Sequence, residues 1–244
     1  MSAMLLRGCR PGDILIADGR IAGIGADLPA PPGTVIEDAH GLLALPAFVE
    51  GHTHLDKTLW GMTWYVNEVG PRLIDRIENE RAQRNRLGLD PARQSERLAR
   101  EFLARGTTRI RTHVDIDTEI GLRHVEALLA LRERLRGTMD LQLVAFPQSG
   151  LLVRPGTLDL MEAALRAGAD LVGGIDPSVI DRDPVGHMDA VFGLAARFGR
   201  PIDIHLHEAG ELGAYALDLL IERTRANGMA GQVTASHAFC LGEV

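Results

Sequence analysis

The chain has 244 residues, of which 45% are hydrophobic and 24% are charged, as is ordinary for a soluble globular protein. Its net charge of −7 at pH 7 argues against a nucleic-acid-binding protein, and no apolar run approaches the roughly 20 residues of a membrane span. The first ten residues lack the long apolar stretch of a signal peptide, so a cytoplasmic protein is expected.

Residues 1–45 predict a small β-rich unit. Asp18-Gly19 lies between two β-rich runs within residues 12–25, which is a strong signal of a β-hairpin. Prolines and a glycine interrupt residues 29–33, and strand-like character returns in residues 35–45. Gly23-Ile24-Gly25 hints at a dinucleotide-binding loop, but the third glycine of that motif is missing.

From residue 46 onward, strand-like runs alternate with helix-like segments. The runs cover residues 46–54, 108–115, 141–147, 170–175, 201–207 and 232–237. This alternation predicts a parallel sheet. Six such units suit a TIM-type (β/α)8 barrel with about six strands present, since a whole barrel needs about 250 residues. A doubly wound open sheet is the alternative topology.

Two helix starts can be predicted from capping residues. Asp90 is expected to cap a helix that has Pro91 at its first position and ends at Gly106. Thr157 is expected to cap another helix, whose apolar stripe lies within residues 160–165.

The segment Glu50-Gly51-His52-Thr53-His54 is the most informative part of the chain. It follows an apolar run over residues 42–49 that predicts a buried strand. Histidines at positions i and i+2 of a strand point to the same face, so His52 and His54 could hold one metal ion from one side. His205 and His237 also follow predicted strands. Borderline metals such as zinc favour imidazole ligands, and a catalytic site keeps one coordination position open for water.

Other polar residues fall at the predicted strand ends, where the active site of such a barrel forms. They are His113, Gln148, Asp176, His207 and Glu208. A lone strand histidine is more often a packed core residue, and this remains the alternative for His113. A carboxylate such as Glu208 beside metal-bound water is a natural proton shuttle, although an acid at a helix start is its simpler interpretation.

For several residues the sequence leaves the role open or favours a purely structural one. Asp203, His205 and His207 share one strand face, so either histidine could face the metal. His124 and His187 lie on helical segments and His40 has no partner in view, while Asp56 and Lys57 could simply pair in a loop.

Together these residues resemble the amidohydrolase superfamily, and most closely its cytosine deaminase-like branch, which also holds enzymes that remove amino groups from triazine rings. The matching phrases, in family order, are HTHLDKT at 52–58, RTHVD at 111–115, FPQ at 146–148, HLHE at 205–208 and TASH at 234–237. The N-terminal hairpin resembles the start of the family's small β-sandwich. Residues 1–45 would thus be part of that sandwich, and residues 46–244 an incomplete barrel.

The resemblance implies a metal site and the residues around it. Three histidines would bind one divalent ion, Fe²⁺ or Zn²⁺: His52, His54 and His205. Glu208 would carry a proton from the metal-bound water to a ring nitrogen, and His237 would hold the attacking hydroxide. Gln148 would hydrogen-bond the edge of a small nitrogen heterocycle.

The implied reaction is hydrolytic release of ammonia or an amine from a cytosine-like or triazine-like ring. A two-metal site in this superfamily needs a lysine after the fourth strand, but the only lysine is Lys57, so one metal is expected. The paired cysteines of the cytidine-deaminase zinc motif are absent as well.

Trp60 and Trp64 could stack on the heterocycle or be packing residues. A cyclic-amide hydrolase and a truncated, non-catalytic metal-binding module are the alternatives.

The resemblance also implies an aspartate at the end of an eighth strand, where it touches the metal and the attacking water. The sequence ends just past the sixth predicted strand, and neither Asp176 nor Asp203 matches that motif. We therefore expect an incomplete gene product, a fragment or one piece of a larger assembly. The exposed edges of an unclosed barrel could be covered by self-association into a homo-oligomer.

Overall fold

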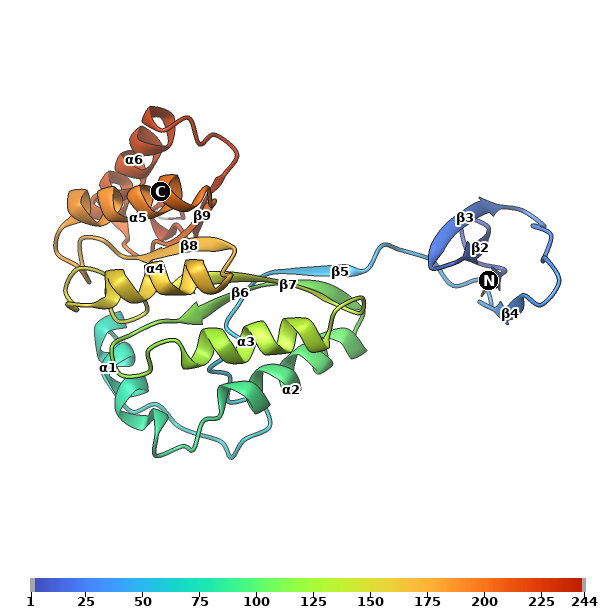
Figure 1. The fold of residues 1–244 in the computed structure, drawn as a ribbon, viewed down its shortest axis with the longest axis horizontal. Coiled ribbons are helices and arrows are strands. Elements are labelled where there is room, and N and C mark those ends of the chain that lie inside the picture. The colour runs from blue at the N-terminus through green and yellow to red at the C-terminus, as the bar shows by residue number, and fades with distance from the viewer. Residues whose placement is uncertain (1–2, 243–244) are drawn as a thin grey trace. The chain divides into compact units, whose positions relative to one another are not determined.

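The computed structural model describes residues 3–242, and the chain divides into two compact units (Figure 1). The first unit is Met1–Ala47 and the second is Phe48–Val244. Each unit contains its own sheet. In the part of the chain that the structure describes, no helix is long and apolar enough to cross a membrane.

The first unit is a four-stranded, mostly antiparallel sheet. Its strands are β1 Ala3–Arg7, β2 Asp13–Ala17, β3 Arg20–Gly25 and β4 Val35–Asp38, in the spatial order β3-β2-β1-β4. Asp18 and Gly19 join β2 to β3 with φ angles of 50° and 74°, the left-handed backbone that a tight hairpin turn requires. The predicted hairpin is confirmed.

The second unit contains a curled, parallel, six-stranded sheet. Its strands are β5 Phe48–Thr53, β6 Thr107–Asp115, β7 Asp140–Phe146, β8 Leu171–Ile175, β9 Ile202–His205 and β10 Val233–Ser236. The spatial order is the order along the chain. All six predicted strands form, and the doubly wound alternative is wrong because its strand order would reverse at a switch point. The prediction of a buried strand over residues 42–49 is wrong, because only Phe48 and Val49 of that run belong to β5 and their side chains are 62% and 66% exposed.

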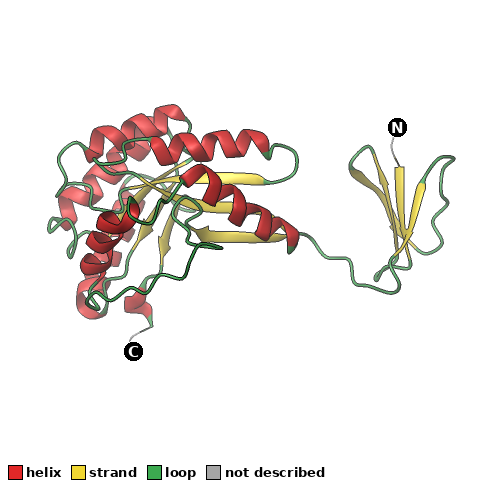
Figure 2. Cartoon of the chain, turned by 90° about the horizontal axis from the view of Figure 1, so that it is seen from below, coloured by secondary structure: helices red, strands yellow, loops and turns green. Residues whose placement is uncertain are grey.

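Helices connect these strands and cover the sheet, as Figures 1 and 2 show. They are α1 Leu73–Arg84, α2 Pro91–Ala104, α3 Arg123–Arg134, α4 Thr157–Ala167, α5 Pro184–Phe198 and α6 Gly210–Ala226, with a short 3-10 helix at Phe239–Leu241. The apolar faces of α2 to α6 and one face of the sheet enclose the main hydrophobic core. Ile77 of α1 instead belongs to a smaller buried cluster that includes Phe146, the last residue of β7. This is half of a TIM-type barrel.

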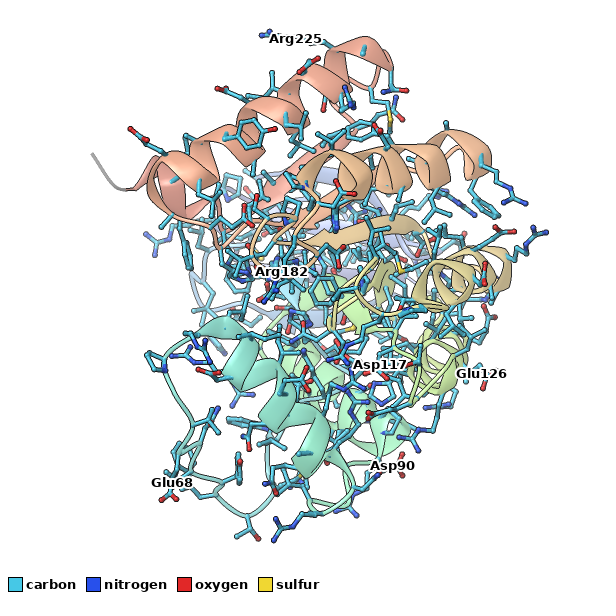
Figure 3. All side chains as sticks on the ribbon, turned by 90° about the vertical axis from the view of Figure 1, so that its left-hand side faces the viewer. Glu68, Asp90, Asp117, Glu126, Arg182 and Arg225 are labelled. Carbon is cyan, nitrogen blue, oxygen red and sulfur yellow. The ribbon has the colours of Figure 1, made fainter. Side chains whose placement is uncertain are left out.

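The capping predictions had different outcomes. Asp90, labelled in Figure 3, accepts hydrogen bonds from the backbone amides of Ala92 and Arg93 at the start of α2, as predicted. The prediction for Thr157 is wrong by one residue, because Gly156 is the N-cap of α4 and has a φ of 95°. Glycine tolerates that backbone without strain, and no side chain caps the start of α4.

The curl of the sheet brings its two edges together on the inside. β5 and β10 are five strands apart in the spatial order. Nevertheless, Nδ1 of His52 on β5 lies 3.1 Å from Oγ of Ser236 on β10. Side chains from β5 and β10, at opposite edges of the sheet, therefore meet on its inside.

Candidate metal centre

Four histidines converge inside the curled sheet. His52, His54, His113 and His205 each offer a ring nitrogen, and these nitrogens all lie within 4.8 Å of one another. They come from β5, the residue after it, β6 and β9. The structure therefore brings together the three predicted ligands and adds His113, whose role the sequence left open between site and core.

The two closest nitrogens are Nε2 of His54 and Nε2 of His205, which are 3.3 Å apart. Two ligands about 2.1 Å from one tetrahedral ion would lie roughly 3.4 Å from each other, so this separation suits a shared metal. The Nδ1 atoms of both rings are buried and have no hydrogen-bond partner among the described residues. The donor set thus fits a divalent cation.

The protonation of these rings also favours metal binding. Burial, followed by repulsion from the neighbouring imidazoles, lowers the pKa of His205 far below its ordinary value. Burial and the charge of Lys57 lower the pKa of His54 in the same direction. Neutral imidazoles keep the lone pair that a metal needs, so both rings are prepared to act as ligands near neutral pH.

His237 lies beside this group. Its ring centroid is 4.8 Å from that of His52 and 4.9 Å from that of His205, and it stacks on His207 at 4.2 Å. Burial and the neighbouring His207 lower the pKa of His237 to about 4, so its ring is neutral at pH 7.

Asp176 positions the segment that follows β9. Its Oδ1 accepts hydrogen bonds from the backbone amides of His207 and Glu208, and its Oδ2 lies 2.6 Å from Nδ1 of His207. Of the two candidates, His205 at the end of β9 therefore joins the histidine group, whereas His207, two residues later, pairs with a carboxylate and stacks on the ring of His237.

Glu208 is buried and only half satisfied. Its Oε1 accepts the backbone amides of Ser178 and Val179, both at 2.7 Å, whereas its Oε2 has no partner among the described residues. Burial raises the pKa of Glu208, although the two amides partly oppose this effect. The residue is not the N-cap of α6, since Ala209 occupies that position. A fixed carboxylate with one free oxygen can transfer a proton.

Gln148 follows β7 and is 9% exposed. Phe146, two residues earlier, packs its ring 4.2 Å from that of His205. Neither Gln148 nor Glu208 makes one of the short contacts among the histidines, and what the two residues share is a position just after a strand of the same sheet. Trp60 and Trp64 are 51% and 88% exposed, which excludes a role in core packing.

The simple loop pairing of Asp56 with Lys57, one of the interpretations left open by the sequence, does not form. Lys57 Nζ lies 3.2 Å from Oδ1 of Asp115 and 3.3 Å from the carboxylate of Glu80. Asp56 instead accepts the backbone amide of Asp115 and faces Nδ1 of His124 at 2.7 Å. His124 is thus a packed helical histidine, and His187 is another, held by Asp181 at 2.6 Å.

Comparisons with known proteins give this geometry a context. The sequence profile described as the amidohydrolase family matches residues 35–241. N-isopropylammelide isopropyl amidohydrolase of Pseudomonas sp. (strain ADP) is 36% identical over 237 residues, which cover 95% of this chain and 58% of that protein.

Two solved structures are similar over almost the whole chain. N-isopropylammelide isopropylaminohydrolase from Burkholderia multivorans ATCC 17616 is 58% identical, with a TM-score of 0.95, and the match covers 100% of this chain and 63% of that one. The 5-methylcytosine deaminase from Klebsiella pneumoniae, liganded with 5-fluorocytosine, is 34% identical, with a TM-score of 0.75 and coverage of 98% and 59%. The present chain spans less than two thirds of the length of each of these three proteins.

Proposed function

The chain belongs to the amidohydrolase family, in its cytosine deaminase-like branch, and we propose that it is the metal-binding part of a hydrolase that removes an amine or ammonia from a cytosine-like or triazine-like ring. The observation that carries this proposal is the convergence of four histidine nitrogens within 4.8 Å of one another. The half-satisfied carboxylate of Glu208 at the neighbouring strand end supports it.

His52, His54 and His205 would hold one divalent ion, either Zn²⁺ or Fe²⁺, since imidazoles accept both. When bound, such an ion supplies a water molecule whose pKa is lowered toward neutrality. A second group of possible ligands, His54, Asp56 and Asp115, lies close by. Lys57 Nζ, 3.2 Å from Asp115, already places a positive charge there, which favours a single metal.

The protein side chains would divide the remaining chemistry among them. Oε2 of Glu208 accepts a proton from the attacking water and passes it to a ring nitrogen. The neutral ring of His237, fixed by stacking on His207, orients that water by hydrogen bonding. Water oxygen then bonds to the ring carbon. The second proton of that water passes through Glu208 to the exocyclic nitrogen, the exocyclic carbon–nitrogen bond breaks, and the neutral amine leaves as the ring carbonyl forms.

Gln148 would recognise the edge of the heterocycle, because its amide offers both a donor and an acceptor. The relatives at 36% and 58% identity are named for N-isopropylammelide, which makes an alkylamino-substituted triazine the first substrate to test. The relative at 34% identity is named for 5-methylcytosine, so the second test substrate is a cytosine-type ring.

Substitution of Glu208 by Gln tests the proposal. Glutamine keeps the shape and accepts the same two amides, but it cannot carry a proton. We expect kcat for amine release from the better of the two substrates to fall by about 10²- to 10⁴-fold. Product analysis by mass spectrometry follows the amine and the hydroxylated ring in the zinc-loaded or iron-loaded protein.

Glu211→Gln is the matched control, because Glu211 is an exposed acid in the first turn of α6, only three residues away. It should leave kcat unchanged. A ring-opened product without free amine would instead indicate a cyclic-amide hydrolase. Metal binding without any product would indicate a non-catalytic metal-binding module, and either result would refute the proposed reaction.

A further inference from the structure

A chain of hydrogen bonds runs from Asp203 through Ser236 to His52. Oγ of Ser236 donates to Oδ1 of Asp203 at 2.6 Å, and Nδ1 of His52 lies 3.1 Å from the same Oγ. Asp203 and Ser236 are 1% and 9% exposed, so water does not compete strongly for these contacts. The two residues belong to the adjacent strands β9 and β10, whereas His52 belongs to β5 at the other edge of the sheet.

The direction of each bond follows from the atoms that form it. Nη1 of Arg111 lies 2.8 Å from Oδ2 of Asp203, so the aspartate forms an ion pair and is a carboxylate. A carboxylate can only accept hydrogen bonds, so the single hydroxyl proton of Ser236 points to Asp203. The serine oxygen can therefore only accept from His52, and Nδ1 of His52 must carry the hydrogen.

We infer that Asp203 and Ser236 are positioning residues, which fix His52 in the Nδ1–H tautomer and hold its Nε2 lone pair toward the other histidines. The inference rests on the proposed function, in which His52 is a metal ligand. Carboxylate partners of ligating histidines act in this way in many metal sites. Here a serine hydroxyl stands between the carboxylate and the imidazole.

His52 differs in this respect from the other two proposed ligands. The Nδ1 atoms of His54 and His205 have no hydrogen-bond partner within residues 3–242. Of these three rings, His52 alone has its tautomer set by a hydrogen-bonded network. Hydrogen-bonded partners should therefore influence metal binding mainly through this chain of Asp203, Ser236 and His52, which we call the relay.

Zinc affinity gives the first test, measured by competition with a chromophoric chelator. Ser236→Ala should weaken zinc binding by about 10- to 100-fold, as loss of such partners does in other metal sites. Ser236→Thr keeps the hydroxyl and should restore near wild-type affinity. Ser149→Ala is the control, because Ser149 is also buried and also faces an aspartate, Asp117, but lies outside the histidine group.

The second test reads the tautomer directly in the metal-free protein. Nitrogen-15 NMR distinguishes Nδ1–H from Nε2–H imidazole, and comparison with His52→Gln assigns the His52 signals. Wild-type and Ser236→Thr proteins should show His52 as Nδ1–H. Ser236→Ala should shift His52 toward a mixture that contains Nε2–H.

The outcomes separate this inference from the proposed function. An Nε2–H tautomer in the wild type, or an unchanged tautomer in Ser236→Ala, overturns the relay whatever the zinc affinity. A changed tautomer with unchanged zinc affinity overturns the positioning role. Failure of the wild type to bind zinc or iron contradicts the proposed function, while the NMR measurement still decides whether the relay exists.

Discussion

At the scale of single residues, buried carboxylates fix the loops around the histidine group. Asp117, labelled in Figure 3, accepts the backbone amides of Glu119 and Ile120, and its other oxygen accepts from Arg84. Asp181 binds the segment that follows Gln148, because its carboxylate accepts three successive backbone amides in residues 151–153. Hydrogen-bonded anions of this kind hold irregular backbone in place where no strand or helix can do so.

Asp181→Asn should lower the free energy of unfolding by about 1.5–3 kcal/mol at pH 7, because it removes the carboxylate that accepts the buried hydrogen bonds of His187 and of the backbone amides. Burial tends to raise the pKa of Asp181, but the bond from His187 and the backbone amides outweigh it and hold the pKa below its ordinary value. The contribution is therefore complete above the unfolded pKa of about 3.9 and is lost as the pH falls through the lower folded value.

Urea denaturation at several pH values checks this prediction. The difference between wild type and Asp181→Asn should be large at pH 7 and shrink below about pH 4. Asp218→Asn, an exposed acid on α6, should change little at any pH. A difference of constant size down to pH 3 would contradict the role given to the ionised carboxylate.

The sequence predicts some of the site residues and not others for a physical reason. His52 and His54 stand out because their i, i+2 spacing on one strand is a local pattern. His113 has no such neighbour, and its side-chain contacts come from other strands, among them the rings of His52 and His205, and Oδ1 of Asp203 at 3.3 Å from its Nε2. The roles of Asp203 and Ser236 also depend on partners from other strands, which no local pattern can reveal.

At the scale of single elements, strand β8 requires a glycine where it passes β7. A Cβ atom on Gly173 would lie 2.4 Å from the carbonyl oxygen of Ala145 and 3.1 Å from Cα of Phe146. Both are backbone atoms, so the strands would have to move apart. Phe146 packs on His205, and Asp176 follows β8 directly, so that movement would also reach the histidine group.

We predict that Gly173→Ala lowers the free energy of unfolding by about 1–3 kcal/mol, because the added methyl group overpacks the sheet. Gly193→Ala is the matched control. Gly193 lies in α5, and a Cβ atom there meets nothing within 4 Å. Alanine should stabilise that helix by about 0.5–1 kcal/mol. Thermal unfolding compares the two variants, and a Gly173→Ala protein as stable as wild type would contradict the close approach.

The regular elements were largely predictable because they depend on local patterns. Strand-like runs identified the six strands, and the capping aspartate identified the start of α2. The apolar run over residues 42–49 was misleading, because most of it precedes β5 and its large side chains are exposed. The start of α4 was misplaced because Gly156 and Thr157 can both begin a helix, and only the backbone conformation of Gly156 distinguishes them. Burial of the apolar stripe of α4, including Met161 and Leu165, agrees with the predicted periodicity.

At the scale of the whole molecule, the curvature of the sheet turns separate strand ends into one site. Without it, His52 on β5 and Ser236 on β10 would lie at opposite edges of a six-stranded sheet. The alternation of strands and helices predicts a barrel-like sheet, but the particular pairs of residues that meet across it depend on the register of five strand pairings. The sequence therefore predicts the type of site better than its contacts.

Titration of the metal-free protein with Zn²⁺, with amine release from N-isopropylammelide followed at each addition, tests the central claim most directly. One metal held by the histidine group predicts that the rate of amine release rises with added zinc and reaches a plateau at one equivalent per chain. Saturation with zinc and then with iron without any release of amine, from this substrate or a cytosine-type ring, would contradict the account.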